Sequence, residues 1–381
     1  MGIKRAVALE GGGAKGAYHI GVLKALKVLD IKVDCITGSS IGAINGAITA
    51  QGDFLKLYNM WKNIDKLKMF DKDAEKIINI IIGNKNEEKL SIKEIINLFK
   101  EKGINTDNIY NLIEEYINIK KLYKSKIDYG LATVEYPSFK VLNLFKNDIK
   151  QENMKKYILA SATFPGFKFT EIDDKLFIDG GVKDNCPVNM LIDEDKYDEI
   201  IEVRTYSIGI YKKIKNNKSK IITISPSKSL GHILSFDQKV INNSIKLGYY
   251  DTFKAFEKVY GNKYCIYKFD NNYLLYKLMN ISDDTIEKIS KYFTTTDINS
   301  KKILFEIIIP KLTTMLKINK KASYDEIVLD VLEYLAHKLN IDELHFYHID
   351  KFIIEINDRI KNFVPTTKLD NVCLLLFKEL V

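Results

Sequence analysis

Residues 33–47 read VDCITGSSIGAINGA, a short apolar run that ends in a glycine and continues into small residues. Within it, residues 38–42 (GSSIG) fit the pattern G-x-S-x-G, whose glycines Gly38 and Gly42 let the chain turn sharply from a strand into a helix. Such a turn exposes the hydroxyl of its central serine, Ser40, and predicts a nucleophile elbow. The same serine would also suit a helix N-cap, so this pattern alone leaves both roles open.

A second strand, turn and helix pattern precedes this one. Residues 5–9 (RAVAL) are mostly apolar, and residues 11–16 (GGGAKG) form a glycine-rich turn before a helical stretch. Consecutive backbone N–H groups at a helix N-terminus favour negative charge. We therefore expect this turn to stabilise an oxyanion through the backbone of Gly11, Gly12 and Gly13.

The glycine turn also fits a different class of protein. Gly11, Gly13 and Gly16 satisfy G-x-G-x-x-G, the pattern of dinucleotide-binding folds. Asp30 or Asp34 follows at about the spacing of the acidic residue that binds the ribose in such folds. A dinucleotide-binding protein is therefore an alternative that the turn by itself does not exclude.

A third glycine-containing turn carries a carboxylate. Asp179 follows a short apolar run and precedes Gly180 and Gly181, which permit close approach of the backbone. Read alone, D-G-G is a common turn signal, but a carboxylate at a strand end is also a candidate base. His232 is the one histidine whose position in the chain would suit a Ser-Asp-His triad, although its neighbours favour a surface or core histidine.

Composition indicates a globular protein with more than one domain. The chain has 381 residues, of which 46% are hydrophobic and 28% charged. Its net charge of +8 favours anionic surfaces, either acidic membranes or nucleic acid, unless the excess reflects only the general abundance of lysine.

No targeting or metal-binding pattern is visible in the sequence. The four cysteines are scattered without metal-ligand spacing, which favours reduced thiols and no metal site: Cys35, Cys186, Cys265 and Cys373. The N-terminus lacks the apolar core of a signal peptide, and no apolar stretch is long enough to span a bilayer. We expect a cytoplasmic protein that contacts the inner face of the membrane peripherally, if at all.

Strand and helix patterns alternate through most of the chain, which predicts an α/β fold with a mostly parallel sheet covered by helices. Between residues 53 and 119 we expect several amphipathic helices, one opened by a capping box at Ser91 and Glu94. The later pattern is mainly helical and contains a second capping box, at Ser323 and Glu326. We therefore predict a catalytic domain over residues 1–261 and a mainly helical domain of unknown role over residues 262–381.

Taken in order, GGGAKG, GSSIG and DGG make the chain resemble the patatin-like phospholipase family. The likeness extends to residues 160–166 (ASATFPG) and 179–188 (DGGVKDNCPV), and covers about residues 4–260. Lys15 stands where many members carry arginine, which keeps the positive charge but loses the planar guanidinium. Ile41 is bulkier than the alanine often found there.

This resemblance implies a three-layer α/β/α patatin-like fold and a lipid acyl hydrolase of phospholipase A type. Ser40 would be the nucleophile and Asp179 its general base, with the glycine turn as oxyanion hole and no cofactor or catalytic metal. Membrane lipid or another acyl ester would be the substrate, and no nucleic acid is expected as partner. A catalytically idle lipid-binding or regulatory protein on the same fold is the main alternative.

Overall fold

The computed structural model describes residues 2–64, 103, 105–293 and 300–381, so the capping box predicted at Ser91 and Glu94 lies outside the described residues. The chain divides into two compact units, Met1–Ala255 and Phe256–Val381. Each is described by itself below. The assignment of a catalytic and a helical domain stays a prediction.

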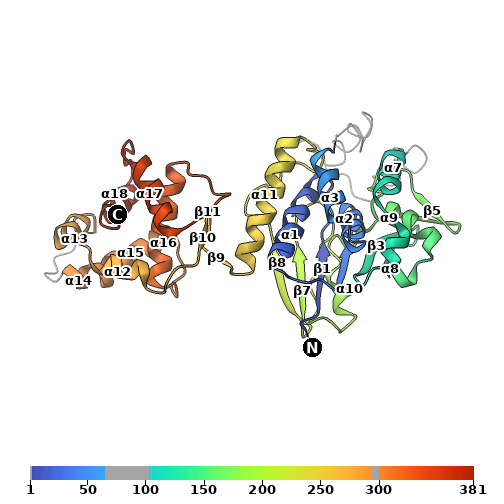
Figure 1. Ribbon diagram of the computed structural model, residues 1–381, viewed down its shortest axis with the longest axis horizontal. Helices are drawn as coiled ribbons and strands as arrows, with labels where there is room; N and C mark the ends of the chain where they lie inside the picture. The colour runs from blue at the N-terminus through green and yellow to red at the C-terminus, as the bar shows by residue number, and fades with distance from the viewer. Residues whose placement is uncertain (1, 65–102, 104, 294–299) are drawn as a thin grey trace. The chain divides into compact units, whose positions relative to one another are not determined.

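The first unit is built on an eight-stranded sheet in the order β5-β6-β3-β2-β1-β7-β8, with β4 paired to β3 (Figure 1). Five neighbouring strands from β3 to β8 run parallel, whereas β4, β5 and β6 are antiparallel to their partners. The strands are β1 (Arg5–Leu9), β2 (Cys35–Gly38), β3 (Asp128–Tyr136), β4 (Lys140–Phe145), β5 (Thr170–Ile172), β6 (Lys175–Asp179), β7 (Glu199–Val203) and β8 (Lys220–Ile224).

Helices cover both faces of this sheet. One face carries a core shared by α1 (Ala17–Val28), α2 (Ile41–Ala50), α3 (Phe54–Lys62), α7 (Asp107–Tyr116), α8 (Ile119–Lys124), α9 (Met154–Ser161) and α11 (Gln238–Ala255). On the other face, α10 (Val188–Ile192) packs against Ala6 and Ala8 of β1. Short helical turns complete the unit: η1 (Gly13–Gly16), η2 (Lys146–Asp148), η3 (Gln151–Asn153) and η4 (Gly180–Val182). The predicted fold class, a mostly parallel sheet flanked by helices, is confirmed.

The central strand β3 brings two other strand ends together. β4 pairs with residues 130–135 of β3, β2 with residues 128–131 and β6 with residues 133–136. Because a strand has only two edges and β4 occupies one of them, β2 and β6 must share the other edge. They run in opposite directions and therefore meet end to end, with Gly38 opposite Leu131 and Asp179 opposite Thr133.

The second unit is mainly helical, as predicted, but it also contains a small sheet that the sequence patterns did not predict. Its strands pair in the order β11-β10-β9: β9 (Val259–Tyr260), β10 (Cys265–Tyr267) and β11 (Phe346–Tyr347). Its helices are α12 (Tyr273–Met279), α13 (Asp283–Ser290), α14 (Ser300–Lys302), η5 (Ile303–Ile308), α15 (Ile309–Leu316), α16 (Tyr324–Lys338), α17 (Ile349–Ile360) and α18 (Lys368–Lys378). The capping box predicted at Ser323 and Glu326 is confirmed at the start of α16.

Candidate active site

The GSSIG segment forms a strained turn between β2 and α2. Ser40 has φ 56° and ψ −129°, a backbone conformation that is costly for a residue with a side chain. A Cβ added to Gly38 would lie 2.3 Å from the Gly42 backbone, and one added to Gly42 would lie 2.3 Å from the Leu9 carbonyl oxygen. Both glycines are therefore needed for the chain to turn this tightly against β1.

Ser40 occupies the N-cap position of α2, but its side chain makes no capping hydrogen bond. The backbone N–H of Ser40 donates to the carbonyl and the hydroxyl oxygen of Ser161, both at 3.1 Å. Ser161 is fixed in turn, because its hydroxyl donates to the Ala132 carbonyl at 2.7 Å. The turn is thus anchored through its backbone, and the Ser40 hydroxyl is not used to cap the helix.

Asp179 ends β6 and is almost completely buried, with 2% of its surface exposed. Its backbone N–H donates to the Thr163 carbonyl, and Oδ1 accepts a hydrogen bond of 2.7 Å from the Gly181 N–H. Oδ2 is buried and has no well-formed hydrogen bond within the described part of the chain. One of the two carboxylate oxygens therefore lacks a well-formed hydrogen bond, which is unusual for a buried polar group.

Burial raises the pKa of Asp179 to about 7, and the Ser40 hydroxyl and the Gly181 N–H act in the opposite direction by favouring the charged form. The Ser40 hydroxyl therefore approaches the carboxyl group without completing a well-aligned hydrogen bond. Catalytic hydrogen bonds are often loose in this way before substrate binds. An aspartate with this pKa is a far better base at neutral pH than an ordinary one, whose pKa lies near 3.9.

Gly180 allows the two strand ends to approach each other. A Cβ added to it would lie 2.2 Å from the Ala132 carbonyl oxygen and 2.4 Å from the Ser39 hydroxyl oxygen. Real Cβ atoms do not come this close to other atoms, so a larger residue would push the two strand ends apart. Gly180 therefore lets Asp179 lie beside the serine turn.

The GGGAKG turn lies directly against Ser40. A Cβ added to Gly11 would lie 3.0 Å from the Cβ of Ser40, and Gly12 and Gly13 have φ values of 145° and 55°. The N–H of Gly11 donates to the Asn185 carbonyl at 2.9 Å. In contrast, the N–H groups of Gly12 and Gly13 have no hydrogen-bond partner among residues 2–64, 103, 105–293 and 300–381. Of the three predicted donors, two are thus unengaged and one is already committed.

The turn also brings a donor that the sequence analysis missed. Ile41 follows Ser40 at the first position of α2, and its N–H likewise has no partner in the described structure. In α/β-hydrolases with a nucleophile elbow, the N–H of the residue after the nucleophile helps to bind the oxyanion. The signal was present in the sequence, because the first N–H groups of any helix lack partners within the helix.

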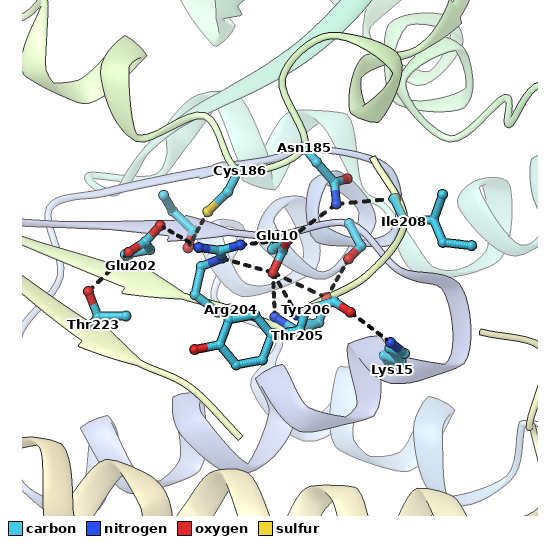
Figure 2. Close-up of polar contacts among 12 residues, drawn as sticks. Glu10, Lys15, Asn185, Cys186, Glu202, Arg204, Thr205, Tyr206, Ile208 and Thr223 are labelled. Carbon is cyan, nitrogen blue, oxygen red and sulfur yellow. Dashed lines mark hydrogen bonds and ion pairs between the residues drawn. The ribbon is translucent and has the colours of Figure 1, made fainter. Parts of the chain in front are cut away.

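The buried carboxylate of Glu10 connects the glycine turn to the chain that follows β7 (Figure 2). Glu10 is 1% exposed and accepts hydrogen bonds from Arg204 Nε at 3.1 Å and from the backbone N–H groups of Thr205 and Tyr206. The Thr205 hydroxyl then donates to the Gly11 carbonyl at 2.7 Å. These contacts tie the turn after β1 to the chain after β7. Sequence analysis missed this cluster, whose members lie about 195 positions apart.

The motif residues Lys15 and Gly16 support the turn. Lys15 Nζ donates to the Tyr206 carbonyl at 3.0 Å, as Figure 2 shows, and burial lowers the pKa of Lys15 while nearby Glu10 opposes this effect. A Cβ added to Gly16 would lie 2.7 Å from Ile41 Cγ1. Lys15 thus fixes the turn to its neighbour, and Gly16 allows α1 to start close to the serine turn.

No histidine of the described residues is hydrogen-bonded to Ser40 or Asp179. His232 is exposed, and its Nδ1 accepts a hydrogen bond from the nearby Leu234 N–H. His19 is fully buried beside Asn45, and burial lowers its pKa to about 3, so it stays neutral at physiological pH. The geometry thus offers a serine and an aspartate, without the histidine that a triad requires.

The structure argues against the dinucleotide alternative. Asp34 precedes β2 and accepts a hydrogen bond from the Arg5 N–H, where the parallel strands begin, whereas the glycine turn lies where β1 ends. Asp30 follows the end of α1, also far along the helix from that turn. Neither aspartate is placed to bind a ribose next to a pyrophosphate on Gly11, Gly13 and Gly16. Among the described residues, no group of acidic, histidine or cysteine side chains could hold a metal ion.

Comparison with known proteins identifies the family that the segment with these three turns resembles. Residues 7–192 match the model of the family described as patatin-like phospholipase. Patatin-like phospholipase domain-containing protein 6 of Mus musculus is 52% identical over 46 residues, which are 12% of this chain and 3% of that protein. Patatin-like phospholipase domain-containing protein 7 of Rattus norvegicus is 26% identical over 196 residues, covering 49% of this chain and 12% of that protein.

The chain therefore spans only a small part of the length of these curated relatives. Among solved structures, VipD from Legionella pneumophila aligns with a TM-score of 0.44 and 14% sequence identity, over 99% of this chain and 91% of that chain. The match to the family confirms the resemblance predicted from the three motifs. The chain thus carries a domain of the patatin-like phospholipase family, which the family match places over residues 7–192.

Proposed function

We propose that this protein is a lipid acyl hydrolase that cleaves the acyl esters of glycerophospholipids or related lipids with Ser40 as nucleophile and Asp179 as general base. One observation carries the proposal: a serine on a strained turn lies beside a buried aspartate whose Oδ2 lacks a well-formed hydrogen bond and whose pKa is raised to about 7. Membership of the patatin-like phospholipase family supports lipid as the substrate class.

In the proposed reaction, Ser40 Oγ attacks the ester carbonyl carbon and its proton passes to Asp179. The ester C–O bond then breaks, and the leaving alcohol takes the proton from Asp179. A water molecule attacks the acyl-enzyme, giving its proton to the same carboxylate, and the fatty acid leaves as the Ser40 hydroxyl is restored. Each cycle consumes one ester and one water and produces one acid and one alcohol.

The negative charge on the carbonyl oxygen would be stabilised by unengaged backbone donors. Gly12, Gly13 and Ile41 all present N–H groups without partners in the described structure; Ile41 follows Ser40, and Gly12 and Gly13 follow Gly11, which approaches Ser40 closely. A donor of this kind contributes roughly 3–4 kcal/mol to transition-state stabilisation in a comparable site. The role of Gly11 is then structural, because its N–H already binds the Asn185 carbonyl.

The proposal is tested by incubating the full chain with phospholipid and lysophospholipid substrates and measuring released fatty acid by mass spectrometry. We expect release by the wild type and by His232→Ala, and none by Ser40→Ala. If folded wild-type protein binds these lipids but releases no acid from any of them, the idle lipid-binding alternative is the better description. Loss of activity in His232→Ala would instead favour a triad.

A further inference from the structure

The loop after β7 presents a cluster of apolar side chains to solvent beside the candidate site. Among the described residues, 15 large hydrophobic side chains are exposed, and four of them lie within six positions of each other. These four are Tyr206, Ile208, Ile210 and Tyr211, with 59%, 50%, 43% and 36% exposure respectively. Isolated exposed hydrophobic residues are ordinary, but a contiguous cluster marks an interaction surface.

Buried or half-buried side chains alternate with exposed ones at the start of this loop, over residues 205–208. Thr205 is buried and hydrogen-bonds Glu10 and Gly11, and Ser207 packs so closely that a Cβ on Gly12 would lie 2.8 Å from its Cβ. Thr205 and Ser207 therefore face the glycine turn, whereas Tyr206 between them and Ile208 after them are exposed.

The loop backbone is held firmly against the candidate site. The Ile210 N–H donates to the Gly181 carbonyl, and the Ile210 carbonyl accepts from the Asn185 N–H, both at 2.8 Å. Gly181 directly follows the segment that carries Asp179. The Arg204 guanidinium packs 3.7 Å from the centre of the Tyr211 ring and 5.2 Å from that of Tyr206. The apolar cluster is thus presented at a fixed position next to the catalytic groups.

The same segment is rich in basic residues, four of which pair with acidic residues of other segments: Arg204 with Glu10, Lys212 with Asp184, Lys215 with Asp193 and Lys218 with Asp195. Residues 204–220 contain six lysines and arginines and no aspartate or glutamate. Lys212 and Lys213 follow the apolar cluster directly; Lys212 pairs with buried Asp184 at 3.1 Å, and Lys213 is exposed without an ion-pair partner in the described structure. Apolar and tyrosine side chains flanked by lysines are typical of protein segments that bind the interface of an anionic membrane.

We propose that residues 206–213 dock the catalytic site on an anionic lipid surface, with the side chains of Tyr206, Ile208 and Ile210 inserted among the lipids, Tyr211 held against Arg204 at their base, and Lys213 near the lipid headgroups. This inference rests on the proposed lipid hydrolase function, which requires the site to meet a lipid surface. The loop would set which face of the molecule meets the lipid surface, and its lysines would favour anionic lipid.

The test measures binding of the full chain to vesicles of phosphatidylcholine alone and of phosphatidylcholine with about a third phosphatidylglycerol. We expect the wild type to bind strongly only to the anionic vesicles. The double variant Ile208→Ser/Ile210→Ser should bind them at least about tenfold more weakly, since two isoleucine side chains no longer insert. Lys213→Gln should reduce the preference for phosphatidylglycerol and the sensitivity of binding to salt.

Two exposed apolar residues near the other end of the central strands provide a matched control. Ile3 and Val28 are 52% and 58% exposed, and they lie before the start of β1 and at the end of α1. The double variant Ile3→Ser/Val28→Ser should bind anionic vesicles like the wild type. Equal binding by Ile208→Ser/Ile210→Ser and the wild type, or no vesicle binding by the wild type, would overturn the docking proposal. A wild-type dimer that dissociates in Ile208→Ser/Ile210→Ser would overturn it in favour of a second copy of the chain.

A water-soluble short-chain ester separates docking from catalysis. We expect the ratio of vesicle hydrolysis to soluble-ester hydrolysis to fall about tenfold in Ile208→Ser/Ile210→Ser. Hydrolysis of the soluble ester by protein that binds no vesicles would refute docking and leave the hydrolase intact. Vesicle binding by this loop without hydrolysis of any ester would refute the hydrolase and leave the docking surface intact.

Discussion

The turn after β1 and the turn after β2 are neighbours with the same local plan, yet they are held in different ways. Each joins a parallel strand to a helix through glycines, and Leu9 and Gly38 are paired at the ends of the two strands. In the serine turn, Gly38 and Gly42 allow the strained conformation of Ser40, and distant Ser161 anchors the turn only through the Ser40 N–H. The glycine turn is held by the carboxylate of Glu10, the residue just before it, which binds Arg204 and Thr205 about 195 positions away.

This difference shows how two chemical tasks are divided. A nucleophile needs one side chain at one position, and a short sequence pattern can supply that. Oxyanion binding needs several backbone N–H groups with unfilled hydrogen bonds, which the protein keeps in place only through contacts with distant segments. Substitutions at the two turns should therefore have different consequences.

Among substitutions at the two turns and their supports, removal of the proposed base should lower activity most. We expect Asp179→Asn to lower kcat for a soluble ester by about 10³-fold, since general base catalysis contributes about 10²- to 10⁴-fold. Initial rates with purified, folded protein measure this. Asp251→Asn is a matched control, because Asp251 is also buried with a raised pKa but binds Tyr18 and Ser227 away from the site. Near-normal activity of Asp179→Asn would rule out the dyad.

Blocking the glycine turn should have the next largest effect. Gly12→Ala should lower kcat by about 10²-fold, because one oxyanion donor is worth about 10²- to 10³-fold and the new Cβ would meet Ser207 at 2.8 Å. Gly52→Ala provides the control: Gly52 also has a positive φ, 88°, but its Cβ would meet nothing within 4 Å. A similar loss of activity in both variants would attribute the effect to backbone strain rather than to the oxyanion hole.

The raised pKa of Asp179 predicts the pH dependence of the reaction. The base must be ionised, so kcat/KM should fall about tenfold for each pH unit below about 7. The folded protein also binds more protons than the unfolded chain between pH 4 and 7, so this aspartate destabilises the protein as the pH rises through that window. Asp179→Asn should therefore be more stable than wild type above pH 7, by on the order of 3–4 kcal/mol, and not below pH 4.

Thermal unfolding at pH 4 and pH 8 measures the stability difference, and a pH series of initial rates measures the activity. A rate that stays constant from pH 8 to pH 5 would contradict ionisation of Asp179 as the controlling event. An Asp179→Asn variant that is less stable than wild type at pH 8 would show that the buried carboxylate stabilises the fold instead.

Loosening the long-range support of the glycine turn should have the smallest effect. Glu10→Gln weakens the contacts to Arg204 and the residues after it, and should lower kcat about five- to tenfold together with a lower Tm. Glu199→Gln is the matched control, because Glu199 also joins β1 to β7, through Arg5 at 2.6 Å, but at the opposite edge of the sheet. We expect Glu199→Gln to lower the Tm without lowering kcat. An equal loss of kcat in both variants would show that Glu10 affects activity through overall stability and not through the glycine turn.

Local features of the fold were predictable because they depend on neighbouring residues. The strand over residues 5–9, the turn at Ser40 and the capping box at Ser323 and Glu326 all follow from short patterns, and the structure contains each of them. The alternation of strand and helix patterns predicted the α/β class, and the family motifs added a resemblance that the family match confirms.

Features that depend on distant segments were not predictable. Nothing in the sequence indicates that β2 and β6 share one edge of β3, which brings Asp179 to the serine turn. The Asn185 carbonyl that occupies the Gly11 N–H lies 174 positions away, so the sequence could not distinguish an engaged donor from unengaged ones. The strands of the second unit have only two or three residues, too few for an alternating pattern.

Covalent labelling of the full chain with a fluorophosphonate, which reacts with activated serines, tests most directly whether Ser40 is a nucleophile. We expect intact-mass measurement to find one adduct on the wild type and on Ser39→Ala, which alters the neighbouring serine of the same turn, and none on Ser40→Ala. Labelling that persists in Ser40→Ala, or a wild type that never reacts, would contradict the assignment of Ser40 as an activated nucleophile.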